Sequence, residues 1–134
     1  MSNADVLLSA IPDAEVKDIG GVRIDIVKAG ASRVKRMIYP PGFRWSRDMK
    51  AIVRTEWCMH AHVGFLARGQ IHIAYQDGCT LEFAAPQVMV IEPGHDGWVV
   101  GDEPAVVIEF DFERETTSRL GMPAFHSHDT SVRA

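Results

Sequence analysis

The sequence lacks the features of a secreted or membrane-spanning protein. None of its apolar runs approaches the roughly 18 residues that a transmembrane helix requires. Its start, MSNADVLLSAIPDAEVKD, carries acidic residues and no basic region of the kind that opens a secretory signal. Only two cysteines are present, Cys58 and Cys79, which fits a reducing compartment better than a disulfide framework. We therefore expect a cytoplasmic protein with no membrane partner.

Positive charge is in the minority. Lysine and arginine number 14 against 18 aspartate and glutamate, giving a net charge of −4. A nucleic-acid-binding surface normally needs a basic excess, so we expect no nucleic-acid partner. The short basic stretch SRVKR, at 32–36, is predicted to be a solvated strand or loop. The sequence also shows no Ser-His-Asp order, phosphate loop or glycine-rich nucleotide motif.

Short strands bounded by turn residues dominate what is present. VRIDIV, at 22–27, alternates apolar and polar residues with the period of a half-buried strand. GQIHIAYQDGCTLEF, at 69–83, predicts a hairpin that turns at Asp77-Gly78. Further strands are predicted in RVKRMIYPPG, QVMVIEPG and GWVVGDEPAVVIEFDF. Seven or more such strands without a long helix predict an all-β antiparallel sandwich or barrel.

The two ends of the chain differ from this central region. Residues 1–19 are predicted to be an N-terminal segment with at most a short helix, because Pro12 interrupts a weak helical pattern. Residues 20–113 are predicted to form the β domain. Residues 114–134 lose the alternation and are expected to be a loose C-terminal tail with an apolar anchor at 122–125. A histidine pair in this tail, His126 and His128, is expected to form no site.

Four side chains with metal-ligand chemistry are concentrated in TEWCMHAHVGFLARGQ, at 55–70. Glu56, Cys58, His60 and His62 all stand at even positions and share one face if the segment is an extended strand. Residues two apart are within joint reach of one ion. Cys58 and His62 are about 13 Å apart on a straight strand, so both can bind one ion only if the chain bends between them. On spacing alone, a metal site and an ordinary solvated strand remain equally open.

A further ligand must come from elsewhere in the sequence. The candidate is His95, which follows a Pro-Gly turn at a strand end, where loops commonly build sites. A thiolate with imidazoles suits zinc, whereas carboxylate and imidazoles also suit iron, manganese or nickel. The predicted cofactor is a divalent metal, with zinc ahead of the others because of Cys58.

From Trp45 to Phe112, the sequence resembles the cupin superfamily. VGFLARGQIHI is similar to the family's apolar strand with its punctuating glycine, here Gly69, and VMVIEPGHDGWVV is similar to its second motif. The resemblance implies a cupin-type jelly-roll barrel. Counting back from Gly69 places the family's ligand positions on three residues of the cluster, Glu56, Cys58 and His62. In the second motif a strict count falls on Gly97, and the histidine present is His95.

The resemblance implies two functional hypotheses and names no reaction. The first is a metal-dependent protein that acts on a small organic molecule, with His60 as an acid or base beside the metal. The alternative is a non-catalytic ligand-binding or sensing module with a structural or lost metal site. Whether the protein is an enzyme is left open. We also expect a homodimer, because small barrels expose edge strands that need cover.

Overall fold

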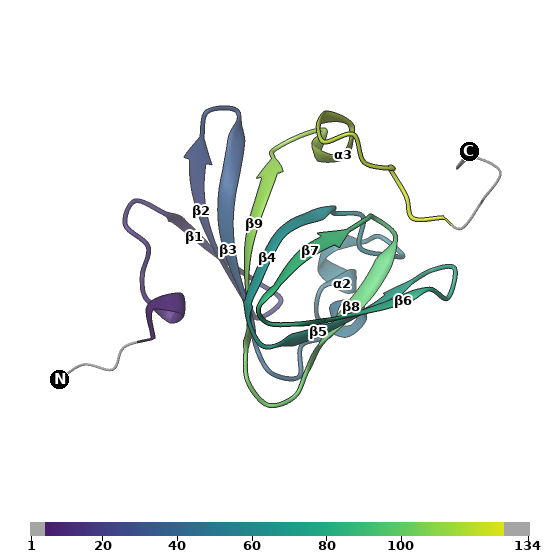
Figure 1. Ribbon diagram of the computed structural model, residues 1–134, viewed down its shortest axis with the longest axis horizontal. Coiled ribbons are helices and arrows are strands. Elements are labelled where there is room, and N and C mark those ends of the chain that lie inside the picture. Colours follow the sequence, from purple (N-terminus) through teal and green to yellow (C-terminus); the bar gives the residue numbers. More distant parts are fainter. Residues whose placement is uncertain (1–4, 128–134) are drawn as a thin grey trace.

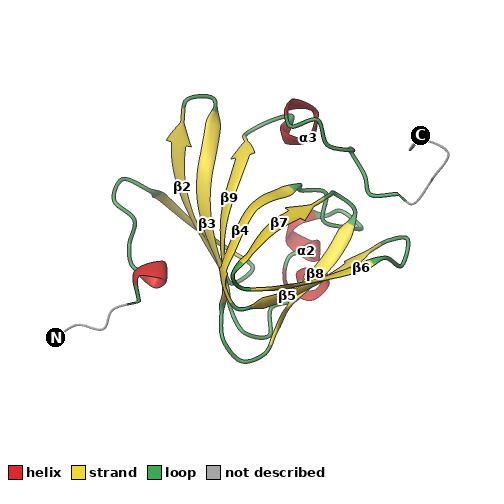
Figure 2. Ribbon diagram, viewed as in Figure 1, coloured by secondary structure: helices red, strands yellow, loops and turns green. Residues whose placement is uncertain are grey.

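The structure of the chain is a computed structural model that describes residues 5–127. The predictions for 1–4 and for 128–134, His128 among them, lie outside the described residues. Strands are the main regular structure of the described chain, and the helices are short (Figure 2). The elements in chain order are η1 (Val6–Leu8), β1 (Glu15–Ile19), β2 (Val22–Ala29), β3 (Ser32–Tyr39), α1 (Trp45–Asp48), α2 (Lys50–Val53), β4 (His62–Arg68), β5 (Gln70–Tyr75), β6 (Thr80–Ala84), β7 (Gln87–Ile91), β8 (His95–Val100), β9 (Ala105–Phe112) and α3 (Thr116–Arg119).

The strands form two antiparallel sheets. The larger has the order β1-β2-β3-β9-β4-β7 and the smaller the order β6-β5-β8 (Figure 1). The all-β prediction is confirmed. Within residues 5–127 no strand pairing joins the two sheets, so closure into one barrel stays a prediction.

The hairpin predicted around Asp77-Gly78 is present. Strands β5 and β6 pair in register, with Ile71 opposite Phe83 and Ile73 opposite Leu81. Gly78 has a φ of +90°, a conformation that glycine adopts without strain. The alternation of the two strands buries Ile71, Ile73 and Phe83 against the larger sheet. Because the turn chemistry and the apolar period agree, this register is fixed locally.

The central strand β9 places charge in the interior. Its neighbours are β3 on one side and β4 on the other. Glu109 and Asp111 point inward and are almost completely buried, whereas Phe110 points outward and is half exposed. On β3, Lys35 pairs in register with Glu109, and Arg33 with Asp111.

The basic stretch at 32–36 is therefore not solvated, and that prediction is wrong. Lys35 and Arg36 are both buried, on opposite faces of β3. Lys35 Nζ lies 2.6 Å from Asp111 Oδ2, and Arg36 Nη2 donates to Asp25 Oδ2 at 2.8 Å. Each cation is buried together with a carboxylate, which offsets the cost of removing it from water.

Both ends of the described chain pack onto this framework. The strand β1 at 15–19 pairs with β2, and Arg36 Nη1 donates to the backbone oxygens of Leu7 and Ser9. At the other end His126 is buried and its ring stacks on Tyr75 at 3.6 Å between centroids. The tail is thus held by His126, a contact that its sequence did not predict. The division at 19/20 and 113/114 stays a prediction.

No helix within residues 5–127 is long and apolar enough to cross a membrane.

Candidate functional site

The candidate site begins with a backbone contact between Cys58 and the start of β8. Cys58 N donates to the backbone oxygen of His95 at 2.8 Å, and Gly94 N donates to the backbone oxygen of Cys58 at 2.8 Å. This isolated bridge fixes two residues that are far apart in sequence beside each other. The Pro-Gly turn before β8 therefore sets the position of the Cys58 side chain as well as that of His95.

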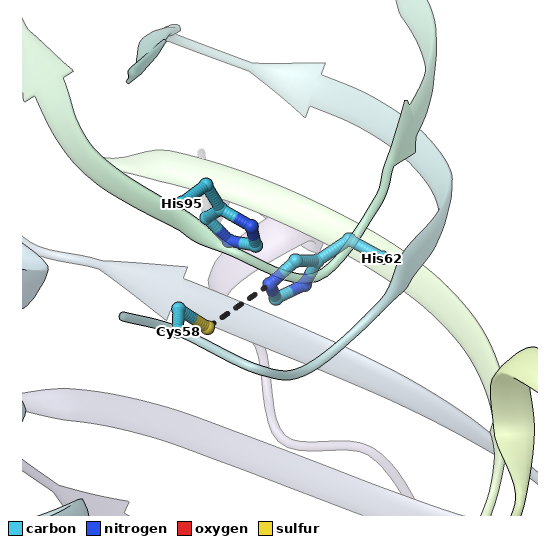
Figure 3. Close-up of side chains that lie close together, drawn as sticks. All are labelled: Cys58, His62 and His95. Carbon is cyan, nitrogen blue, oxygen red and sulfur yellow. Dashed lines mark hydrogen bonds between the residues drawn. The ribbon is translucent and has the colours of Figure 1, made fainter. Parts of the chain in front are cut away.

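His62 reaches the same place because the chain bends. Residues 59–61 are irregular, and β4 begins at His62. The bend brings His62 Nε2 to 3.9 Å from Cys58 Sγ, in place of the separation of an extended strand. In Figure 3 the side chains of Cys58, His62 and His95 point toward one another. One ligand atom from each lies within 4.8 Å of the others, and all three residues are buried.

Each histidine ring is held through its Nδ1 atom. His62 Nδ1 lies 2.5 Å from Glu109 Oε1, and His95 Nδ1 lies 2.8 Å from the backbone oxygen of Glu92. These acceptors select the tautomer that carries the proton on Nδ1, so Nε2 is the atom with a lone pair to offer. An imidazole held by a carboxylate or a carbonyl in this way is the usual arrangement around a metal ligand. The three residues therefore fit a divalent ion with a preference for sulfur and nitrogen.

Burial keeps two of these groups neutral in the absence of an ion. Burial raises the pKa of the Cys58 thiol to about 12. Burial and the neighbouring His62 ring lower the pKa of His95 to about 3. A metal would have to displace the thiol proton, so binding would release a proton and strengthen as the pH rises.

A second group of ligand types, His60, His62 and Glu109, also lies within 4.8 Å. This group is the poorer candidate for a metal site because a cationic side chain, Lys35, already lies beside it. Lys35 Nζ lies 3.3 Å from His60 Nε2 and 3.7 Å from Glu109 Oε2. A divalent ion there would be repelled by the buried ammonium group of Lys35, which lies at hydrogen-bond distance from His60.

A cavity of about 480 Å³ adjoins the cluster and is lined by both sheets. Most of its wall is apolar. His60 and the charged pair Lys35 and Glu109 form part of the lining, together with the three cluster residues. Cavities of this size and character commonly bind small organic molecules.

The charged part of the wall is a connected network. Asp111 accepts two hydrogen bonds from Arg33, at 2.8 and 2.9 Å, and lies 3.3 Å from His60 Nε2. Burial opposes ionisation of Asp111, but its contacts with His60, Arg33 and Lys35 outweigh burial and lower its pKa. In Glu109 the neighbouring His62 and His60 likewise outweigh burial and hold the pKa well below its ordinary value.

His60 responds to the same two carboxylates. Burial acts to lower its pKa, but contacts with Asp111 and Glu109 outweigh burial and raise it. Its side chain is 36% exposed, the highest fraction among the residues of this network, and it forms part of the cavity lining.

The sequence-derived candidates thus separate into two groups. The structure brings together Cys58, His62 and His95, with His60 next to them. Glu56 lies apart: its side chain is 74% exposed and pairs with Lys50 at 3.4 Å. Sequence reasoning missed Glu109, which holds His62, because the EFDF stretch of β9 reads as acids outside and phenylalanines inside.

Comparison with solved structures shows that other proteins share the fold of this chain. A Cupin 2 conserved barrel domain protein from Salinispora arenicola is 14% identical, with coverage of 85% of this chain and 94% of that one and a TM-score of 0.55. A cupin-like protein from Thermotoga maritima is 16% identical, with coverage of 80% and 77% and a TM-score of 0.51. The cupin domain of Cnp3 from Schizosaccharomyces pombe is 11% identical, with coverage of 84% and 74% and a TM-score of 0.51.

The chain therefore has the cupin fold that its motifs indicated. No protein-family model matches the sequence, and comparison with curated proteins finds no significant match. At these identities the likeness defines the fold, and the function must be argued from the site.

Proposed function

We propose that this chain binds one divalent ion, zinc ahead of iron, manganese or nickel, at Cys58, His62 and His95, next to a cavity for a small organic molecule. The observation that carries the proposal is the state of the two histidine rings. Each is fixed through Nδ1 by an acceptor, which leaves Nε2 as the ligand atom, and in His62 this atom lies at hydrogen-bond distance from the cysteine sulfur. A sulfur atom with two imidazole nitrogens is a donor set that favours zinc.

Three protein ligands leave one coordination position for a small molecule, which is typical of catalytic and not of structural zinc. A bound ion would supply Lewis-acid chemistry at that position. Residues of the chain would exclude water, orient the ligands and hold a proton. The apolar wall excludes water, Glu109 fixes the ring of His62, and His60 holds a proton at Nε2 between Asp111 and the cavity. We therefore propose an enzyme in which His60 is the general acid or base.

The test is the metal content of the full chain, purified without a histidine tag and measured by elemental analysis after dialysis against zinc. We expect about one zinc ion per chain, retained after gel filtration. Iron or manganese in place of zinc at the same ratio would support the site but would identify a different ion as its ligand. Less than about a tenth of an ion per chain of any divalent metal would contradict the proposal.

A second candidate function is a metal-free ligand-binding module. It is favoured by the pKa values of the cluster, since a neutral thiol and a neutral His95 leave that end of the cavity uncharged. The two functions differ in their response to chelation. Ligand binding that is unchanged by a chelator, in a protein that shows no turnover with zinc, would favour the binding module.

We also propose a homodimer in which β7 pairs with β7 of a second copy. Within residues 5–127, β7 pairs only with β4, and its sequence QVMVI carries no charge that would discourage another strand. Val88 and Val90 are exposed on its outer face. An antiparallel pair of identical edges satisfies two-fold symmetry.

In light scattering after gel filtration, the wild type should have twice the chain mass of 14.9 kDa. Replacing Val88 and Val90 by lysine should give the mass of one chain, because charged side chains on the edge oppose strand pairing. The matched control is Ile52→Lys, which changes an exposed apolar residue on α2 and should leave the dimer intact. A wild type that is monomeric at micromolar concentration would contradict the proposal.

A further inference from the structure

One buried oxygen of Glu109, a residue that lines the cavity, has no hydrogen-bond partner in the described part of the chain. Glu109 is 1% exposed, and its Oε1 atom takes the 2.5 Å contact with His62. Its Oε2 atom has no hydrogen-bond partner among residues 5–127. The nearest cationic groups, Lys35 Nζ at 3.7 Å and His60 Nε2 at 3.8 Å, are outside hydrogen-bond distance. A buried acceptor left in this state is costly, so it indicates a partner that enters the cavity.

The rest of the cavity indicates what that partner looks like. Its other lining residues are largely aliphatic or aromatic, among them Ile24, Ile26, Met37, Phe43, Ile73 and Ile91. Such walls favour an apolar body, and a volume of about 480 Å³ accommodates a small organic molecule. The polar and apolar parts of the lining together fit an amphipathic molecule.

We propose that the cavity binds a small molecule with an apolar body and a hydroxyl head, and that the hydroxyl donates its hydrogen bond to Glu109 Oε2. The inference rests on the proposed function, whose ligand it defines. The charges around Glu109 select the head group. A carboxylate head would face the carboxylate of Glu109, and an ammonium head would face the ammonium of Lys35. A neutral hydroxyl avoids both repulsions, and its oxygen can still accept a hydrogen bond from Lys35.

The test uses three probes that share one body: 4-propylphenol, its methyl ether 4-propylanisole, and 4-propylbenzoate. Each is titrated calorimetrically into the full chain after removal of metal with a chelator, so that a bound ion cannot discriminate between them. The phenol should bind about tenfold or more tightly than the methyl ether, because only the phenol can donate to the buried oxygen. The benzoate should bind more weakly than the phenol.

A substitution at Glu109 tests whether the preference for the phenol over the ether depends on Oε2. In Glu109→Gln, the side-chain amide can still accept a hydrogen bond from His62, but an NH₂ group replaces Oε2. The phenol and the ether should then bind with about equal affinity. The control is Asp25→Asn, which changes an equally buried carboxylate that is bonded to Arg36 outside the cavity lining, and it should keep the preference.

The outcomes of this test are separate from those of the metal measurement. Equal affinity for phenol and ether in the wild type, or no binding of either, overturns the inference whatever Glu109→Gln does, so the test does not depend on that variant folding. If the preference is found but the chain binds no metal, the inference holds and the proposed metal site fails. If metal binds but the preference is absent, the metal site holds and the hydroxyl ligand is rejected.

Discussion

Replacing Cys58 by serine together with His62 by alanine should weaken zinc binding by more than about 100-fold. The double variant removes two of the three atoms that converge in the cluster and leaves only His95. Losing even an outer residue that orients a ligand typically costs 10- to 100-fold in metal affinity, and losing the ligands themselves costs more. The affinity can be measured by competition with a chromogenic chelator at pH 7.5, where deprotonation of the buried thiol is coupled to binding.

The chain offers matched controls for this experiment. Cys79→Ser removes the other cysteine, which is half-buried in the β5–β6 turn region, and Glu56→Gln removes a candidate that lies on the surface. Both variants should bind zinc as tightly as the wild type. If Glu56→Gln weakened zinc binding as much as the double variant, the ion would lie elsewhere and the cluster of Cys58, His62 and His95 would be rejected as its site.

Replacing Asp111 by alanine should lower the free energy of unfolding by about 3 kcal/mol. Asp111 is 1% exposed and contacts Arg33, Lys35 and His60. Without it, the ammonium group of Lys35 stays buried with its closest counterion removed, and breaking a buried ion pair from one side is strongly destabilising. Urea unfolding monitored by tryptophan fluorescence measures the difference.

The control is Glu15→Ala, which breaks an exposed pair with Lys17 and should cost less than about 1 kcal/mol.

The dependence of stability on acid pH provides a second measurement. Since the pKa of Asp111 is lower in the folded chain than in the unfolded chain, ionised Asp111 stabilises the fold above about pH 4. That stabilisation is lost as the pH falls below about 4 toward the folded pKa. Asp111→Ala should therefore lose less stability than the wild type between pH 5 and about pH 3. An acid profile identical to that of the wild type would show that Asp111 is not held by these cations.

Much of the fold could be predicted from local sequence because period and turn chemistry agree there. The β5–β6 hairpin is the clearest example, since Ile71, Ile73 and Phe83 alternate around an Asp-Gly turn. The members of the candidate cluster could be predicted for a similar reason, because Cys58 and His62 stand close in sequence and His95 follows a recognisable Pro-Gly turn. None of these features depends on knowing which distant strands pair.

The parts that were missed depend on long-range pairing. In β9 the acids face inward and Phe110 faces outward, opposite to the usual pattern, because Arg33 and Lys35 on β3 neutralise the acids across the strand pair. This reversal of the usual burial pattern cannot be recognised until β3 and β9 are known to be neighbours. The bend at 59–61, which brings Cys58 to His62, likewise depends on the bridge between Cys58 and His95.

The position of β9 sets the order in which the site can be assembled during synthesis. It is the last strand within residues 5–127, yet it lies between β3 and β4 in the middle of the larger sheet. As the chain leaves the ribosome, His62 has no acceptor for Nδ1, and Lys35 has no counterion, until Glu109 and Asp111 emerge with this strand. If the proposed metal site exists, an ion would therefore be held in its final geometry only after β9 has joined the sheet.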